Sequence, residues 1–274
     1  MARAYDWESG YAGANGTSFH YERAGAGEPL VLLHAGIADQ RMWDGQVPVF
    51  AQHYDVIRYD ARGYGNTHAG AGRYSRSQDL YGLMMVLGVE RAVLLGSSQG
   101  GTDAIDFALE HPAMAAGLAL VSAVPSGYQL QGEPPRRVLE FMSAYQQRDL
   151  ERASELAAQV WLDGPHRTPD QMDPHIRGWV RNMMRDVLAA GAMDTTGEEP
   201  SSEPAVGRLS ELRVPTLVVV GDQDDPSILQ AGERMTSEIP GAEKLVICGA
   251  AHLLNIEKPE EFNRVVLDFL RRTY

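Results

Sequence analysis

Short apolar runs alternate along the chain with stretches of helical period. The runs that we expect to be strands cover residues 30–33, 56–59, 92–95, 118–121, 216–220 and 244–248. Several of them are apolar without alternation, which is typical of strands covered on both faces in a parallel sheet. Residues 17–23 alternate weakly after Asn15 and Gly16, a pair that favours a tight hairpin turn, so the chain is expected to open with an antiparallel hairpin.

Helical patterns fill the intervals between these runs. Leu80, Leu83, Met84 and Leu87 recur at the spacing of one helix face, and the apolar positions of residues 262–269 repeat that spacing. A hairpin followed by repeated strand and helix units predicts an α/β fold. We therefore expect a mostly parallel central sheet with helices on both faces.

This rhythm is interrupted between the expected strands at 118–121 and 216–220. Residues 125–205 contain no convincing strand pattern, and their helix-like stretches are 136–147, 150–161 and 176–190. The polar tract 195–204, rich in Thr, Ser, Glu and Pro, is expected to be an exposed connector. The pattern predicts a core domain made of residues 1–124 and 206–274, with a helical cap at 125–205 inserted into it.

Composition limits the classes of partner. The 274 residues have 44% hydrophobic and 22% charged side chains and a formal charge of −13, which argues against nucleic acid or an anionic membrane as the main partner. Residues 1–8 lack the apolar core of a signal peptide, and no apolar run approaches the length of a membrane span. We expect a cytoplasmic protein, without a membrane span, that acts on a small molecule.

The single cysteine, Cys248, excludes an internal disulfide and is consistent with a reducing compartment. It ends the apolar run 244–248, so we expect a buried strand thiol.

Residues 93–101, Val-Leu-Leu-Gly-Ser-Ser-Gln-Gly-Gly, carry the strongest chemical signal. An apolar strand ends in a Gly-x-Ser-x-Gly turn and a helix-compatible stretch follows, which is the context of a nucleophilic serine. The motif alone is a weak signal, and Ser97 is the alternative nucleophile. The frame formed by Gly96 and Gly100 selects Ser98, because these glycines let neighbouring backbone approach the turn closely.

In five segments, taken in order, the chain resembles the α/β-hydrolase family, in particular its serine esterases and lactonases with an inserted cap. The segments are 32–36 (Leu-Leu-His-Ala-Gly), 60–67 (Asp-Ala-Arg-Gly-Tyr-Gly-Asn-Thr), 96–101 (the serine turn), 221–224 (Gly-Asp-Gln-Asp) and 250–252 (Ala-Ala-His) with Glu257 and Pro259 beyond. Many members have His-Gly where this chain has His34 and Ala35, which is a mild departure.

The resemblance implies a role for each polar group. Ser98 would be the nucleophile, His252 the general base and Asp224 the acid that orients the imidazole. Asp222 and Asp225 lie nearby, but the family's Gly-x-x-Asp spacing selects Asp224. The backbone N–H groups of Gly36 and Gln99 would then form the oxyanion hole.

Other polar residues of these motifs have structural interpretations. His34 is expected to be structural, because a triad needs one base. Asp60 and Arg62 are expected to brace their loop through an ion pair with each other. In the cap, Trp161 and Met142 are the residues expected to reach the substrate, in a mainly apolar pocket.

These expectations describe a serine hydrolase without metal or other cofactor. It would cleave a carboxylic ester or lactone of modest size through an acyl-enzyme on Ser98, and it could form a homodimer. The same triad could instead hydrolyse a carbon–carbon bond in a diketone or catalyse perhydrolysis. A ligand-binding protein that keeps the fold without turnover is the alternative from another class. A dehalogenase or epoxide hydrolase would need a carboxylate at position 98.

Overall fold

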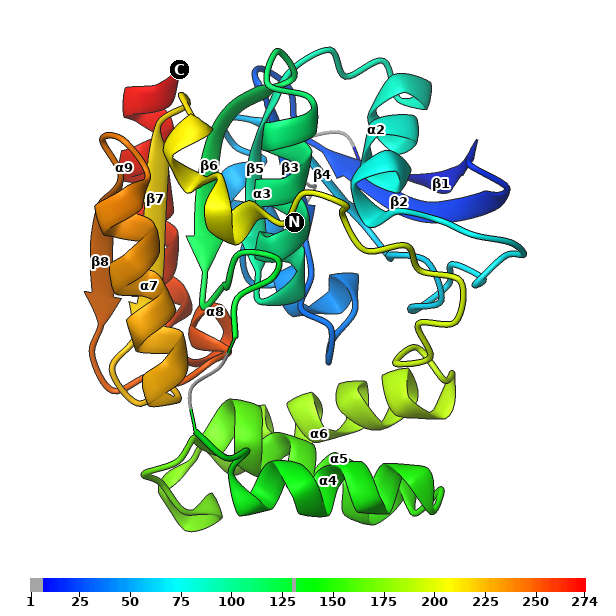
Figure 1. Cartoon of the computed structure of the whole chain (residues 1–274), viewed down its shortest axis with the longest axis vertical. Helices are drawn as coiled ribbons and strands as arrows, with labels where there is room; N and C mark the ends of the chain where they lie inside the picture. The colour runs from blue at the N-terminus through cyan, green and yellow to red at the C-terminus, as the bar shows by residue number, and fades with distance from the viewer. Residues whose placement is uncertain (1–6, 130–131) are drawn as a thin grey trace.

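The computed structural model describes residues 7–129 and 132–274, and these residues form one eight-stranded sheet in the order β1-β2-β4-β3-β5-β6-β7-β8 (Figure 1). The strands are β1 (Trp7–Ala14), β2 (Thr17–Ala24), β3 (Pro29–Leu33), β4 (Asp55–Tyr59), β5 (Ala92–Ser97), β6 (Ala115–Val121), β7 (Thr216–Gly221) and β8 (Glu243–Ile247). In this order, each strand from β4 to β8 pairs with its neighbour in parallel. Strand β2 pairs antiparallel with both β1 and β4. The predicted mostly parallel sheet is confirmed.

The opening hairpin turns at Asn15 and Gly16, with φ of 48° and 75°. Two successive residues with positive φ match the right-handed twist of the flanking strands, so the predicted hairpin is present. The hairpin implies a strand before the turn, but the sequence gives no range for β1, because Ala12 is its only fully buried residue and its apolar pattern is therefore weak. Residues 1–6, part of the segment tested for a signal peptide, lie outside the described residues.

Helices cover both faces of the sheet, as the sequence predicts (Figure 1). They are α1 (Val47–Phe50), α2 (Arg76–Val86), α3 (Gln99–Glu110), α4 (Arg136–Gln146), α5 (Leu150–Ala158), α6 (Pro174–Ala189), α7 (Pro226–Glu238), α8 (Leu254–Glu257) and α9 (Pro259–Thr273). Successive side chains of a strand point to opposite faces. Leu30 and Leu32 of β3 therefore pack in a cluster with α1, α8 and α9, whereas Val31 and Leu33 pack with α2, α3 and α7.

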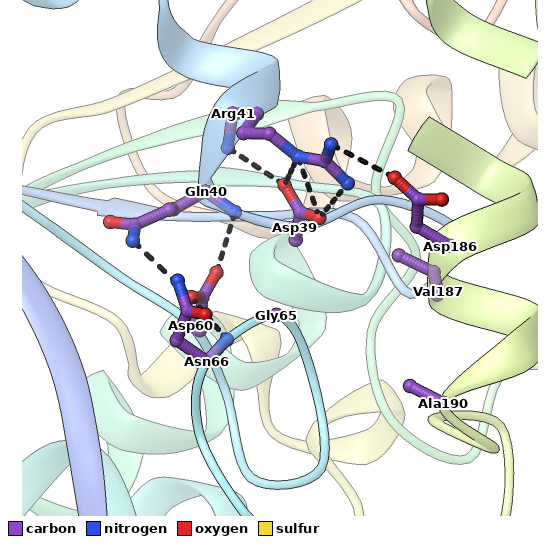
Figure 2. A pocket seen from close by; sticks show the side chains of 9 residues that line it. All are labelled: Asp39, Gln40, Arg41, Asp60, Gly65, Asn66, Asp186, Val187 and Ala190. Carbon is purple, nitrogen blue, oxygen red and sulfur yellow. Dashed lines mark hydrogen bonds and ion pairs between the residues drawn. The ribbon is translucent and has the colours of Figure 1, made fainter. Parts of the chain in front are cut away.

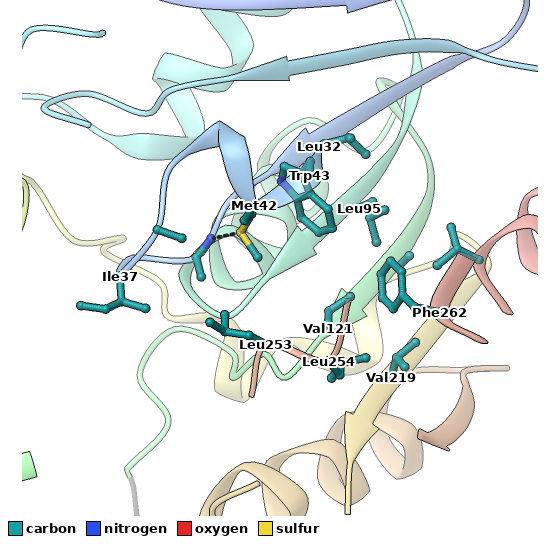
Figure 3. Packing of buried hydrophobic residues seen from close by; sticks show 14 of the residues in the cluster. Leu32, Ile37, Met42, Trp43, Leu95, Val121, Val219, Leu253, Leu254 and Phe262 are labelled. Carbon is teal, nitrogen blue, oxygen red and sulfur yellow. Dashed lines mark hydrogen bonds between the residues drawn. The ribbon is translucent and has the colours of Figure 1, made fainter. Parts of the chain in front are cut away.

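A large aromatic residue fills the first of these clusters beside the sheet. Trp43, at the end of the 3-10 turn Gln40–Trp43, is fully buried, and its ring centre lies 6.3 Å from that of Phe262 on α9. Figure 3 shows Leu32 and Leu95 of the sheet next to Trp43, with Phe262 further away on the same side. Buried aromatic area of this size is a main source of stability in a core.

The chain between β6 and β7 leaves the sheet and forms α4, α5 and α6, which we call the cap helices. They lie beyond the carboxyl ends of the parallel strands (Figure 1). Met183 and Met184 of α6 join the same apolar cluster as Leu253 and Leu254, which follow β8. The three predicted helices are present, while the division of the chain at residues 124/125 and 205/206 into core and cap domains stays a prediction.

The tract 195–204 is mostly exposed, as expected. It is also tied to the core, since Tyr74 N–H donates to Gly197 O at 2.9 Å and Glu199 N–H donates to Tyr74 O at 2.8 Å. Cys248 is exposed, because β8 ends at Ile247 and the chain has already turned outward; the predicted buried thiol is wrong. Of the helices described, none is long and apolar enough to cross a membrane.

Candidate active site

Ser98 lies between the last residue of β5 and the first residue of α3, with φ of 51° and ψ of −114°. Such a backbone is strained for any residue with a Cβ, and strain of this kind gathers at functional sites. The turn is held by Ser98 N–H, which donates to Val121 O at 2.8 Å. Half-buried Ser98 is thus presented on a fixed turn, whereas Ser97 is fully buried in the strand.

The two glycines of the frame allow this turn to pack. A Cβ on Gly96 would lie 2.2 Å from Gly100 O, and a Cβ on Gly100 would lie 2.3 Å from Leu33 O. These distances are far below van der Waals contact, so no larger residue fits without moving the backbone. The close approach expected from the sequence is present.

His252 and Asp224 form a buried hydrogen-bonded pair. Nδ1 of His252 lies 2.9 Å from Oδ2 and 3.2 Å from Oδ1 of Asp224, and both side chains are 4% exposed. Burial alone would lower the pKa of His252, but the Asp224 carboxylate outweighs it and the pKa is raised above its ordinary value. The other ring nitrogen, Nε2, is buried and has no hydrogen-bond partner in the part of the chain that the structure describes.

The neighbouring carboxylates have other partners. Exposed Asp222 accepts a hydrogen bond from Gly249 N–H at 2.6 Å and so ties the loop after β7 to the loop after β8. Asp225 caps α7 by accepting from Ser227 N–H at 2.9 Å. Of the three carboxylates in this loop, the structure joins Asp224 to the histidine.

Ser98, Asp224 and His252 follow β5, β7 and β8, so all lie at the carboxyl edge of the parallel strands, where sheets of this type place their sites. No hydrogen bond joins Ser98 Oγ to His252 Nε2 among residues 7–129 and 132–274. Bonds of this type are often long without substrate and tighten when it binds. A free Nε2 is the acceptor that a serine proton needs.

The two proposed oxyanion donors lie side by side. Gln99 is the first residue of α3, where backbone N–H groups have no partner within the helix. A Cβ on Gly36 would lie 3.3 Å from Cβ of Gln99, so the loop after β3 contacts the start of α3. The two segments that carry the proposed donors are therefore in contact beside the serine turn.

His34 is structural, as expected. Its Nδ1 lies 2.9 Å from Ala35 O, and its Nε2 accepts from Ala61 N–H at 2.9 Å. Burial lowers the pKa of His34, which keeps the ring neutral and able to accept. It joins the loop after β3 to the loop after β4.

The expected ion pair between Asp60 and Arg62 is wrong. Arg62 pairs with buried Asp79 of α2 at 2.8 Å. Asp60 instead accepts from the backbone N–H groups of Gln40 and Asn66, at 3.0 and 2.9 Å. Both residues brace the loop, but each does so through other partners: Arg62 through α2, and Asp60 through the backbone of the two loops beside it.

A cavity of about 500 Å³ lies beside the histidine, between the cap helices and the start of α7. His252 and Asp224 line it from the core, and Trp161 lines it from the cap. Trp161 is carried by a π-helical turn, Gln159–Asp163, which extends α5; such turns often occur at functional sites. Met142 does not line this cavity and is 39% exposed on α4.

The cap is fixed to the histidine loop by an arginine that the sequence did not reveal. Arg167 Nη1 lies 2.7 Å from Glu257 Oε2 and donates to Gly249 O at 3.0 Å. Glu257 Oε1 in turn accepts from Ala251 N–H at 2.8 Å, directly before His252. Arg167 lies in a loop without periodic pattern, so only its distant partners show its importance.

A second cavity, of about 310 Å³, lies between the end of α6 and the loops after β3 and β4, where Arg41 pairs with Asp39 and with Asp186 of α6 (Figure 2). Most of the residues that line it have charged or amide side chains, and none of them is a proposed catalytic residue. Its side chains connect α6 with the turn Gln40–Trp43. No group of three or more metal-ligating side chains occurs among the described residues.

An α/β sheet with a strained serine after β5 and a buried His–Asp pair after β7 and β8 is the architecture of a hydrolase. Residues 28–259 match the family model described as alpha/beta hydrolase fold. A 2-hydroxy-6-oxononadienedioate/2-hydroxy-6-oxononatrienedioate hydrolase of Burkholderia vietnamiensis is 31% identical, over 92% of this chain and 91% of that protein.

Solved structures are similar over nearly the whole chain. The enol-lactonase from Burkholderia xenovorans LB400 has a TM-score of 0.79 and 26% identity, covering 96% of this chain and all of that one (100%). A thermophilic esterase from Thermogutta terrifontis has a TM-score of 0.77 and 25% identity, covering 97% and 99%. The chain belongs to the α/β hydrolase family, and the protein is a hydrolase.

Proposed function

We propose that this protein is a serine hydrolase that cleaves a carboxylic ester or lactone through an acyl-enzyme on Ser98. The observation that carries the proposal is the buried His252–Asp224 pair, with Nε2 of the imidazole left free at the edge where Ser98 turns. The named enol-lactonase and esterase structures support the substrate class.

The first half-reaction forms the acyl-enzyme. Ser98 Oγ attacks the carbonyl carbon while His252 Nε2 takes the hydroxyl proton, and Asp224 stabilises the resulting imidazolium. The carbonyl oxygen becomes an oxyanion that accepts hydrogen bonds from the N–H groups of Gln99 and Gly36. When the tetrahedral intermediate collapses, the bond to the alcohol oxygen breaks and His252 returns the proton to that oxygen.

The second half-reaction releases the acid. Water enters, His252 Nε2 takes one of its protons, and the oxygen attacks the acyl carbon. The intermediate then expels Ser98 Oγ, which regains its proton from the imidazolium. With a lactone, both products are one molecule, a hydroxy acid.

The same groups serve a second candidate, hydrolysis of a carbon–carbon bond next to a ketone. The name of the Burkholderia vietnamiensis relative, at 31% identity, favours it. That reaction needs a proton to be delivered to carbon before or during cleavage, whereas an ester needs a proton on an alcohol oxygen. Comparing substrates of the two types therefore separates the candidates.

The test combines turnover with covalent labelling. Purified protein is assayed against short-chain aryl esters, lactones and a conjugated 2-hydroxy-6-oxo acid, and is labelled with a fluorophosphonate probe. We expect repeated turnover of esters or lactones and labelling that Ser98→Ala abolishes and Ser97→Ala leaves intact. Turnover restricted to the oxo acid favours the second candidate, and release of a single equivalent indicates a binding protein.

A further inference from the structure

We propose that Asp103 and Arg76 are positioning residues of the oxyanion hole, which hold Gln99 and Tyr64 and through them both proposed amide donors. This inference rests on the proposed function, because it takes the N–H groups of Gln99 and Gly36 as the donors. Neither Asp103 nor Arg76 is part of a sequence motif for catalysis.

The first arm of this cluster reaches Gln99. Its side-chain Nε2 donates to Asp103 Oδ1 at 2.9 Å, one turn further along α3. Asp103 is 8% exposed, so water competes little for this bond. A residue anchored at the end of its side chain has less freedom at its backbone. The Gln99 N–H is thus held at the start of the helix.

The second arm reaches Gly36. The hydroxyl of Tyr64 donates to Gly36 O at 3.0 Å, and Tyr64 is only 3% exposed. This bond fixes the loop after β3 from its carbonyl side, in contact with Gln99. The Tyr64 ring also packs in a small apolar cluster with Val187 and Ala192, at the end of the cap helices.

Arg76 of α2 connects the two arms. Its Nη1 lies 4.0 Å from Asp103 Oδ2, and its guanidinium carbon lies 5.8 Å from the centre of the Tyr64 ring. On its other side, Nε donates to Glu198 Oε1 at 3.0 Å, in the segment that returns from the cap to the core. One cation, 12% exposed, therefore contacts both arms and the returning chain.

The cost of burying these charged side chains supports a functional role for Asp103 and Arg76. The charged groups that face Asp103 are Arg76 of α2, Glu198 of the returning segment and Asp106 of α3 itself. Burial raises the pKa of Asp103 to about 6, although Arg76 lowers it in part. An apolar residue would pack there at less cost, and such violations of local preference are expected at functional sites.

The experiment compares Gln99→Met, Asp103→Leu and the double variant on the ester or lactone that the wild-type protein hydrolyses best. Each single variant should lower kcat about tenfold to a hundredfold, because misplacing one donor costs about this much, while KM stays within about twofold. Both break the same contact, so the double variant should be little slower than either single one.

Asp106→Asn is the matched control. Asp106 lies on the same helix and burial also raises its pKa to about 6, but its side chain accepts from Ser126 rather than Gln99. We expect Asp106→Asn to keep wild-type kcat. Asp103→Asn, which cannot ionise, should remove an ionisation near pH 6 from the kcat profile that Asp106→Asn retains.

A wild-type kcat in folded Gln99→Met would overturn the inference. Gln99 is only half-buried, so this variant still tests the inference if Asp103→Leu does not fold. A lowered kcat per folded molecule would exclude a purely stabilising role, because a loss of stability alone lowers the melting temperature and leaves kcat per folded molecule unchanged. A wild-type protein that is labelled at Ser98 and turns over esters keeps the proposed function even when the variants behave as wild type. If the wild-type protein shows neither turnover nor labelling, both the proposed function and this inference are wrong.

Discussion

Asp224 Oδ2 lies 2.9 Å from Nδ1 of His252, although 28 residues separate them along the chain. The parallel pairing of β7 with β8 makes this contact possible, since both residues follow the carboxyl ends of adjacent strands. The contact also decides which of three neighbouring carboxylates serves the histidine. It can be tested directly with matched variants.

Asp224→Asn should lower kcat by about four orders of magnitude, because an amide holds the wrong imidazole tautomer and cannot stabilise the imidazolium. Asp222→Asn, in the same loop, should change kcat by less than about tenfold, since Asp222 contacts Gly249 and not the ring. Steady-state kinetics on the preferred ester measures both. A larger loss in Asp222→Asn would assign the acid to Asp222.

The pH profile follows from the environment of His252. Its pKa is raised, because the attraction of Asp224 outweighs burial, and only the neutral ring accepts a proton. Activity is therefore complete at alkaline pH and is lost as pH falls through the raised pKa. We expect the acid limb of kcat/KM to have its midpoint above about 6.5, the value of an exposed histidine. A midpoint below that value would show that burial dominates.

Most of the sheet could be predicted from sequence, because its strands are apolar runs buried on both faces and each alternates with a helical pattern. The range of strand β1 could not be predicted, since its side chains are mostly exposed and leave little periodic signal. The strand position of Cys248 was wrong for a related reason: an apolar run does not say at which residue the backbone turns away.

Some residues of the candidate site could likewise be predicted from the sequence, and others could not. Ser98, His252 and Asp224 stand in local motifs, so sequence alone points to them. The partners of Arg62 and Arg167 are chosen by three-dimensional proximity, and a charged residue carries no mark of which distant carboxylate it will meet. Met142 was favoured for its residue type, but the direction in which α4 faces places it outward.

The pair of Arg167 and Glu257 should stabilise the fold as a unit. Their side chains are only 14% and 4% exposed, so Arg167→Met, which leaves a buried carboxylate without its cation, should cost about 3 kcal/mol in unfolding free energy. The double variant Arg167→Met with Glu257→Gln should recover part of this loss. Denaturant titration measures all of them, and additive losses would argue against direct coupling.

Two glycine substitutions should have opposite effects. Gly100→Ala places a Cβ 2.3 Å from Leu33 O, so it should destabilise the protein by about 2 kcal/mol or more. Gly178→Ala, within α6, meets nothing within 4 Å and should stabilise it by about 0.5–1 kcal/mol. Thermal and denaturant unfolding distinguish the two. Equal effects would contradict the packing described around the serine turn.

Cys248 is exposed and should react with a thiol reagent in the folded protein. Because it is the only cysteine of the chain, one equivalent of maleimide should be incorporated without denaturant. Cys248→Ser is the control that should incorporate none. If the thiol of the native protein does not react, Cys248 is buried, as its sequence context suggests.

Helices α4, α5 and α6 leave the sheet after β6 and return before β7, which are adjacent strands. An insertion between neighbours leaves the hydrogen-bond ladder of the sheet intact, whatever its length or composition. The proposed reacting residues therefore lie on loops of the sheet, while residues of the inserted segment, among them Trp161, line the other side of the cavity beside His252. Exchange of the inserted piece between relatives offers a route to new substrates with the same reacting atoms.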